Sequence, residues 1–207
     1  DVLDPIEFVQ RVAEFTYTTP VNFPEGTLSG YEFEFRQEMG RLWKRLEGLT
    51  LRGNATLIDS VVTLPEEEQE ALAAENIQAP QETRPMTNAP EHLYNLSLTY
   101  ELGNLNLPLL TDTTLGVFYT VRGDTLVAGA GQSKGNFVPD VFETEFGTLN
   151  VSLTKNLGEH FSVKLQAKNI LNPDIETVFR SEFIGDDVTK TSYQRGREYS
   201  ISLSYSF

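Results

Sequence analysis

Residue types that carry out catalysis or bind metals are sparse in this chain of 207 residues. It contains no cysteine and only two histidines, His92 and His160. His92 precedes a predicted strand and His160 lies in a predicted short turn at the opposite strand end, so we do not expect the two imidazoles to share a metal or a catalytic centre. No serine–histidine–aspartate arrangement is suggested either. The sequence therefore predicts a protein that is not an enzyme and that holds no cofactor or metal.

Carboxylates are the most abundant charged groups, with 30 Asp and Glu against 16 Lys and Arg and a formal net charge of −14. This excess argues against nucleic acid as a partner, because phosphate binding needs a basic face. Segment 65–91 alone holds seven glutamates and one arginine, a net charge of −6. It would select cations if it capped a binding site, but a charge run without aromatic residues is usually only hydrated, and we favour that interpretation. Its first part, 66–76, is expected to form a short helix.

The elements that would position any functional group are strands with a sequence period of two. From 199 to 207 the odd positions are Tyr, Ile, Leu, Tyr and Phe, and every even position is Ser. This alternation gives a strand one apolar and one polar face. The same pattern recurs over 31–36, 49–57, 94–102, 115–121, 149–154 and 161–168, and more weakly over 8–18. The sequence therefore predicts eight strands.

The connections between these strands alternate in length. Short connections lie near 40–48, 103–109 and 155–160, and long ones near 65–91, 128–143 and 181–192. Outer-membrane barrels have this alternation, with short periplasmic turns and long extracellular loops. Tyrosines near both ends of an apolar face, such as Tyr94 and Tyr100, are also typical of a membrane girdle. These features favour an all-β fold, an antiparallel transmembrane β-barrel of about eight strands, over a soluble β-domain.

Five short motifs follow one another in a recognisable order. They are Gly-Tyr-Glu-Phe-Glu-Phe at 30–35, Ala-Thr-Leu-Ile-Asp-Ser at 55–60, Thr-Arg-Pro at 83–85, Asn-Ile-Leu-Asn at 169–172, and Arg-Glu-Tyr through the final Phe at 197–207. Each motif is weak alone. Together they resemble the C-terminal barrel portion of TonB-dependent outer-membrane receptors, over nearly the whole of residues 1–207.

The resemblance implies a receptor of the Gram-negative outer membrane with a 22-stranded barrel and a plug inside it. Such a receptor uses the proton-motive force through TonB to import a scarce ligand, for example a ferric siderophore, cobalamin or an oligosaccharide. No plug and no TonB-contacting segment is recognised here, so we expect the chain to be a piece that supplies the last eight strands. The three long connections would then face the outside of the cell.

The same resemblance implies the partners. They are outer-membrane lipid, the barrel assembly machinery, the plug and other strands of the receptor, TonB through a segment outside this chain, and the transported small ligand. Charged residues on inward strand faces would contact the plug rather than the ligand. These candidates are Glu32, Glu34, Arg36, Arg52, Lys164 and Lys168.

Aromatic residues in the long loops are the candidates for ligand contact. Phe137, Phe142 and Phe183 could stack on a ligand, or fold back onto the barrel rim. Tyr205 and the final Phe207 resemble the terminal signal that barrel proteins present to the assembly machinery.

Two alternatives stay open on the sequence alone. One is a self-contained eight-stranded outer-membrane barrel acting as an adhesin or small pore, since eight strands can close around a side-chain-filled interior. It requires segment 8–18 to pair with 200–207. The other is a soluble antiparallel β-protein that binds a partner, which differs from both barrels in burying its apolar strand faces.

Overall fold

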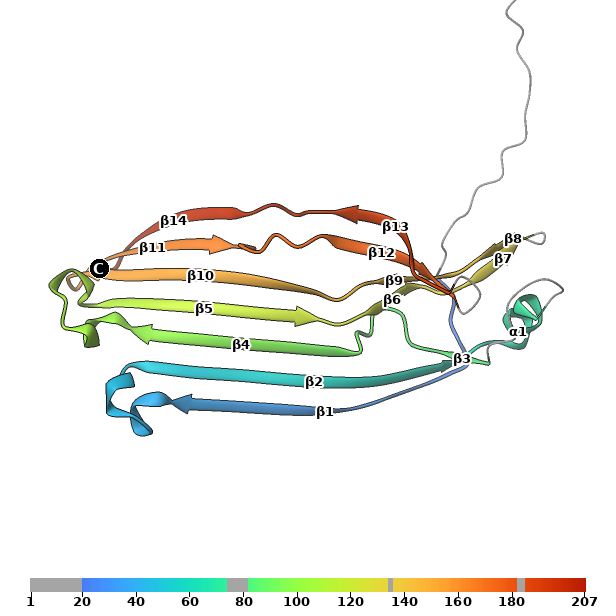
Figure 1. Cartoon of the computed structure of the whole chain (residues 1–207), viewed down its shortest axis with the longest axis horizontal. Coiled ribbons are helices and arrows are strands. Elements are labelled where there is room, and N and C mark those ends of the chain that lie inside the picture. Colours follow the sequence, from blue (N-terminus) through green and yellow to red (C-terminus); the bar gives the residue numbers. More distant parts are fainter. Residues whose placement is uncertain (1–19, 74–81, 134–135, 182–184) are drawn as a thin grey trace, which may run out of the picture.

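The computed structural model describes residues 20–73, 82–133, 136–181 and 185–207 (Figure 1). Strands make up most of it. The longer strands are β1 (Glu25–Glu38), β2 (Leu49–Thr63), β4 (His92–Glu101), β5 (Thr113–Arg122), β10 (Phe146–Leu157), β11 (Phe161–Lys168) and β14 (Glu198–Tyr205). The shorter strands are β3 (Thr83–Arg84), β6 (Thr125–Ala128), β7 (Gly131–Ser133), β8 (Asn136–Val138), β9 (Asp140–Glu143), β12 (Ile175–Arg180) and β13 (Val188–Tyr193).

The helical elements are all short. One α-helix, α1, spans Glu66–Leu72 and confirms the predicted helix over its first two turns, while 74–81 lies outside the described residues. The 3-10 helices are η1 (Met39–Arg41), η2 (Lys44–Leu46), η3 (Leu102–Leu105) and η4 (Pro108–Leu110). Among the described residues no helix is long and apolar enough to cross a membrane.

One sheet forms the body of the molecule, and every neighbouring pair of its strands is antiparallel. The strand order is β1-β2-β4-β5-β10-β11-β14, with β3 beside β2. Figure 1 shows these strands lying side by side along the longest axis. Seven of the eight predicted strands correspond to strands of this sheet, which confirms the antiparallel all-β fold. The predicted strand over 8–18 lies outside the described residues.

The register sorts the side chains into two faces. Polar residues stand opposite polar ones, as Asn54 and Asn95 do, and apolar residues stand opposite apolar ones, as Leu165 and Ile201 do. The apolar face is open to its surroundings, since Ile201 and Leu203 are 67% and 77% exposed. A sheet with one continuous exposed apolar face and one polar face has the amphipathicity of a wall between hydrocarbon and water.

Two glycines on the apolar face lie beneath aromatic rings. A Cβ at Gly53 would lie 2.5 Å from Cε1 of Phe35, its direct cross-strand partner. A Cβ at Gly147 would lie 2.5 Å from the hydroxyl oxygen of Tyr119 on the neighbouring strand. The ring covers the backbone that the glycine leaves bare, a pairing that helps to fix strand register.

A second, smaller sheet continues the main sheet beyond one of its ends. Its order, β13-β12-β9-β6, repeats the order of β14, β11, β10 and β5, and each of its strands joins its long counterpart across a short break (Figure 1). Leu126, Phe142 and Val178 form a buried cluster within it. The long connections therefore carry strands of their own, because hydrogen bonding of the hairpins continues past the breaks.

The two ends of the main sheet differ. The short turns lie at the same end as the last residue of the chain, and α1, the β7–β8 hairpin and the second sheet lie at the other end (Figure 1). There, α1 packs through Leu72 on Leu64 and Ala130, with Phe23 against this cluster. The arrangement matches the predicted alternation of short and long connections.

Candidate functional site

The polar face of the main sheet carries all six residues predicted to contact a plug. Glu32, Glu34 and Arg36 lie on β1, Arg52 lies opposite on β2, and Lys164 and Lys168 lie on β11. They form two groups, separated by β4, β5 and β10. The structure therefore places them on one face but does not gather them into one site.

Two of these residues stand in an unfavourable pairing. Arg36 and Arg52 are direct cross-strand partners, and both are exposed. In the described part of the chain neither guanidinium forms an ion pair with a carboxylate. Like charges directly opposite each other destabilise a sheet, so this pair is suited to an acidic partner from outside. By contrast, Lys168 is already paired, with its Nζ 2.7 Å from Oε1 of Glu198.

A shallow hollow of about 270 Å³ lies beside Arg52 on the polar face. Amides and hydroxyls order its floor: Asn95 Nδ2 donates to Asn54 Oδ1 at 2.8 Å, and Thr120 Oγ1 donates to Asn95 Oδ1 at 2.9 Å. Phe118 lines it and is 43% exposed, an aromatic ring on an otherwise polar surface. Phe118 is not among the site residues that the sequence predicts, although it breaks the alternation of β5.

The Asn-Ile-Leu-Asn motif forms the break between β11 and β12. Asn169 and Asn172 both adopt left-handed backbone conformations, with φ of 53° and 47°. Their side chains bind the segment before β14: Asn169 Nδ2 donates to the Gly196 carbonyl at 2.7 Å, and Gly196 N–H donates to Asn172 Oδ1 at 2.8 Å. Asn172 Nδ2 also donates to Gln194 Oε1 at 2.8 Å. The motif thus fixes two adjacent strands at the level of their breaks.

Phe142, one of the three predicted ligand-stacking residues, lies in the second sheet. It is only 9% exposed, packs on Leu126 and Val178, and has the Arg180 guanidinium over its ring at 4.5 Å. In this structure the ring serves packing, and its contact with a ligand stays a prediction. Phe137 lies in β8, but its side chain is not described, and Phe183 lies outside the described residues.

Arg180 joins two strand ends of the second sheet and the break next to β5. Its guanidinium is 2.8 Å from Asp124 and 2.7 Å from Asp187. The hydrogen bonds with Asp187 raise the pKa of Arg180, against the opposing effect of burial, and they hold the pKa of Asp187 below its ordinary value. Asp124 also accepts the N–H of Glu145 at 2.7 Å. Both carboxylates belong to this chain, so the Arg180 guanidinium already has its ion-pair partners within the fold.

Arg84, the single Lys or Arg of segment 65–91, is half-buried near the cluster formed by Leu64, Leu72 and Ala130. Its guanidinium lies 4.7 Å from the centroid of the Phe23 ring, and its Nε has no described hydrogen-bond partner. Burial lowers the pKa of Arg84, while the charges of Asp140 and Glu68 oppose this. Burial likewise raises the pKa of Asp140, although its carboxylate accepts the Ala130 N–H at 2.6 Å.

The histidines and the terminal aromatics have local partners. His92 Nε2 is 2.8 Å from Glu145 Oε2, and its ring stacks on Tyr94. His160 Nδ1 is 2.9 Å from the carbonyl of Ser206, at the opposite end of the strands. No group of three or more possible metal ligands occurs among the described residues.

Tyr205, predicted as part of an assembly signal, contacts the rings of Phe161 and Phe207. Phe207 is fully exposed. The pair is accessible for recognition, and its role in assembly stays a prediction.

Comparison with known proteins gave one result. The family model described as TonB dependent receptor-like, beta-barrel matches residues 2–170. Searches of curated proteins and of solved structures gave no significant match. Proteins of this family are receptors and transporters rather than enzymes. The chain therefore belongs to the TonB-dependent receptor-like β-barrel family, and it is a β-barrel segment of the Gram-negative outer membrane with a receptor-like role.

Proposed function

We propose that this chain forms part of the wall of a receptor that imports a scarce ligand with energy supplied through TonB. Ferric siderophores, cobalamin and oligosaccharides are the ligand classes that we propose. The observation that carries the proposal is the pair of continuous faces across seven strands, which suits a wall between hydrocarbon and an aqueous or protein-filled interior. The second sheet and the β7–β8 hairpin would then stand on the extracellular side.

The two edge strands of the described sheet support our proposal that the barrel wall extends beyond this chain. β1 and β14 are the outermost strands, and neither has a described partner on its outer side. Unpaired strand edges are unstable in a bilayer, where backbone groups must be hydrogen-bonded. We infer that further strands pair with these edges in the complete barrel.

The polar face supports a plug inside that barrel. Arg36 and Arg52, which form no ion pair among the described residues, lie with Glu32 and Glu34 on the face that we propose to be the interior one, and together they present mixed charges. We propose that acidic side chains of the plug contact the two arginines. In this proposal Phe118 and the hollow beside it receive an apolar side chain of the plug.

Uptake measurements test the proposed function. A strain that carries the complete gene and a strain from which it is deleted would be given labelled ferric siderophores, cobalamin and maltodextrins in turn. We expect accumulation of one ligand that is lost in the deletion strain, in a tonB mutant and after treatment with a protonophore. Uptake that persists without TonB would refute energy coupling.

Disulfide trapping separates this proposal from a closed eight-stranded barrel. The chain has no native cysteine, so introduced pairs report unambiguously. Cysteines at Ala13 and Leu203 would cross-link within one chain only if segment 8–18 pairs with β14. Efficient cross-linking would overturn the larger wall in favour of the self-contained barrel.

A further inference from the structure

The connection between β1 and β2 has a composition that the strand pattern does not explain. Residues 39–46, which we call the basic turn, contain three bases and no Asp or Glu, in a chain with a net charge of −14. The bases are Arg41, Lys44 and Arg45. The basic turn also contains Leu42 and Trp43, the single tryptophan of the chain. Because β1 ends at Glu38, the two faces of the sheet account for neither the charges nor the apolar side chains of this turn.

The basic turn has an ordered backbone but leaves its apolar side chains open. Two 3-10 helices, η1 and η2, lie within it. The backbone N–H of Trp43 donates to the Met39 carbonyl at 2.9 Å, and that of Leu46 donates to the Trp43 carbonyl at 2.8 Å. Even so, Leu42 and Trp43 are 57% and 61% exposed. Large apolar side chains that a fold displays together mark a surface for a partner or a membrane.

Two of the three bases have no carboxylate partner among the described residues. Arg41 Nε lies 2.8 Å from Glu38 Oε2, so its charge is partly compensated. Lys44 and Arg45 are exposed, and neither forms an ion pair in the described part of the chain. Since Lys44 directly follows Trp43, two uncompensated cations stand next to the exposed ring.

A second exposed apolar connection adjoins the basic turn. It spans 102–110, between β4 and β5, and contains no charged residue. Its exposed leucines are Leu105, Leu107 and Leu109. The two connections meet where the backbone N–H of Glu101 donates to the Gly48 carbonyl at 3.0 Å. Both lie at the end of the main sheet where the last residue of the chain lies (Figure 1). This end therefore displays apolar side chains from two adjoining connections, with bases in one of them.

We propose that the basic turn anchors this end of the barrel wall to the bilayer surface by binding the headgroups of anionic phospholipids. An exposed indole and leucine need an apolar layer, and the two uncompensated cations need an anionic one. A bilayer surface supplies both layers side by side, with the tryptophan at their boundary and the basic side chains at the phosphates. The chain is a segment of an outer-membrane barrel, so such a surface adjoins the ends of its strands.

This anchor differs from the contact between the apolar strand faces and lipid chains. The strand faces meet the hydrocarbon of any lipid, whereas the basic turn selects lipids by the charge of their headgroups. A zwitterionic headgroup carries its own cation, so it binds less well. The anchor is independent of the ligand that the receptor transports.

Photo-cross-linking in the native membrane tests the proposal. The protein would be expressed from its complete gene with Trp43→benzoylphenylalanine, whose ketone adds to neighbouring C–H bonds under light. The basic turn lies between Glu38 and Glu47, so cleavage after glutamate releases residues 39–47 as one peptide. The mass of each adduct on this peptide identifies the class of phospholipid. Leu157→benzoylphenylalanine is the matched control position, because Leu157 is the last residue of β10 and is 50% exposed.

We expect anionic lipids to be about five-fold enriched among the adducts at position 43, relative to their share of the membrane. One basic residue near a membrane surface attracts an anionic lipid by about this factor. The enrichment should be near one at position 157, which has Glu159 close to it in sequence. The double variant Lys44→Gln with Arg45→Gln should abolish the enrichment at position 43, and Lys44→Arg with Arg45→Lys should keep it.

A second double variant controls for net charge. Lys190→Gln with Arg195→Gln also removes two positive charges, but Lys190 lies in β13 and Arg195 lies between β13 and β14, away from the short turns. It should leave the enrichment unchanged. Heat-dependent gel mobility selects folded protein, and if the first double variant failed to assemble, positions 43 and 157 of the otherwise unchanged protein would still decide. Adducts at position 43 that are mainly with protein, that follow the lipid composition of the membrane, or that stay enriched without both bases would overturn the proposal.

Discussion

Asn172 lies at the centre of the contacts that join the break after β11 to the segment before β14. Its φ of 47° is left-handed, a conformation that costs alanine about 1 kcal/mol and that asparagine and glycine tolerate better. Its amide makes two hydrogen bonds of 2.8 Å, accepting from the Gly196 N–H and donating to Gln194 Oε1, and a longer one of 3.4 Å from Asn169 Nδ2, too weak to add to the sum below. Each contributes about 0.5 kcal/mol here, the low end of the usual range, because water reaches the site. The Asn172→Ala substitution should therefore destabilise this region by about 2 kcal/mol.

Three substitutions separate the backbone effect from the side-chain effect. Asn172→Gly removes both 2.8 Å hydrogen bonds, and the weak 3.4 Å one, but keeps the conformation, so we expect a loss of about 1 kcal/mol. Asn172→Asp keeps an acceptor for the Gly196 N–H and should lose less than that. The predicted order of destabilisation is Ala, then Gly, then Asp.

Hydrogen exchange followed by mass spectrometry measures the effect where it occurs. A loss of about 2 kcal/mol should speed the exchange of β14 amides through local opening by about 30-fold. Amides of β2 and β4, which lie toward the opposite edge of the sheet from β14, serve as the internal reference. If Asn172→Ala exchanged no faster than Asn172→Gly, the left-handed conformation would have no energetic role and the reasoning would fail.

Three further perturbations test other parts of the fold. Phe142→Ala should destabilise the second sheet by about 3 kcal/mol through cavity formation, seen as faster exchange in β9 and β12 with β2 unchanged. Gly53→Ala should displace the ring of Phe35 and lower the urea midpoint, and adding Phe35→Leu should recover part of the loss. The folded-state pKa of Asp187 lies below its ordinary value of 3.8, so the pair with Arg180 stabilises the fold above that pH and is lost as the pH falls through the lowered value. Asp187→Asn should therefore reduce stability at neutral pH and weaken its decline in acid, measured as urea midpoints across that range.

The strands could be predicted because the chemistry that builds them is local. A wall with hydrocarbon on one side and a polar interior on the other needs alternation at every second residue, as in Tyr199 to Tyr205, and that pattern is visible without any knowledge of the fold. The length of the connections likewise follows from the sequence. The second sheet could not be predicted in the same way, because its strands are short and Phe142 is buried only by pairing with residues distant in sequence.

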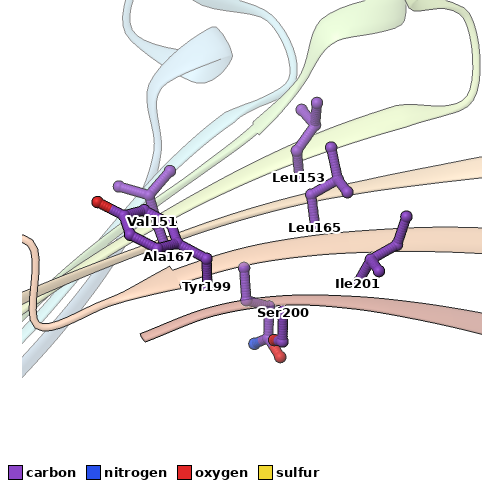
Figure 2. Close-up of a pocket in the computed structure, with 8 residues that line it drawn as sticks. Val151, Leu153, Leu165, Ala167, Tyr199, Ser200 and Ile201 are labelled. Atoms are coloured by element: carbon purple, nitrogen blue, oxygen red, sulfur yellow. The ribbon is translucent and has the colours of Figure 1, made fainter. Parts of the chain in front are cut away.

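The functional surfaces were harder to predict than the strands. Alternation placed the six charged residues on one face, but it carries no information about neighbours across strands. The opposition of Arg36 and Arg52 depends on the register of β1 against β2. The shallow apolar groove lined by Val151, Ala167 and Tyr199 depends on three strands at once (Figure 2).

Some arginines form ion pairs that stabilise the fold, and others have no described carboxylate partner. At the end with the second sheet, Arg180 is bound by Asp124 and Asp187, and Arg122 is 3.0 Å from Glu143. These arginines satisfy carboxylates of their own chain, and removing them would leave those carboxylates unpaired.

On the polar face the situation is reversed. Arg36 and Arg52 oppose each other without a described carboxylate partner, which costs the isolated sheet free energy. We expect the arginine pair to become favourable only when an acidic surface, such as that of the proposed plug, lies against it. Arg36→Gln should therefore stabilise the isolated chain slightly and weaken its association with the proposed plug. A variant that lost stability without the plug would show that the arginine pair supports the sheet itself.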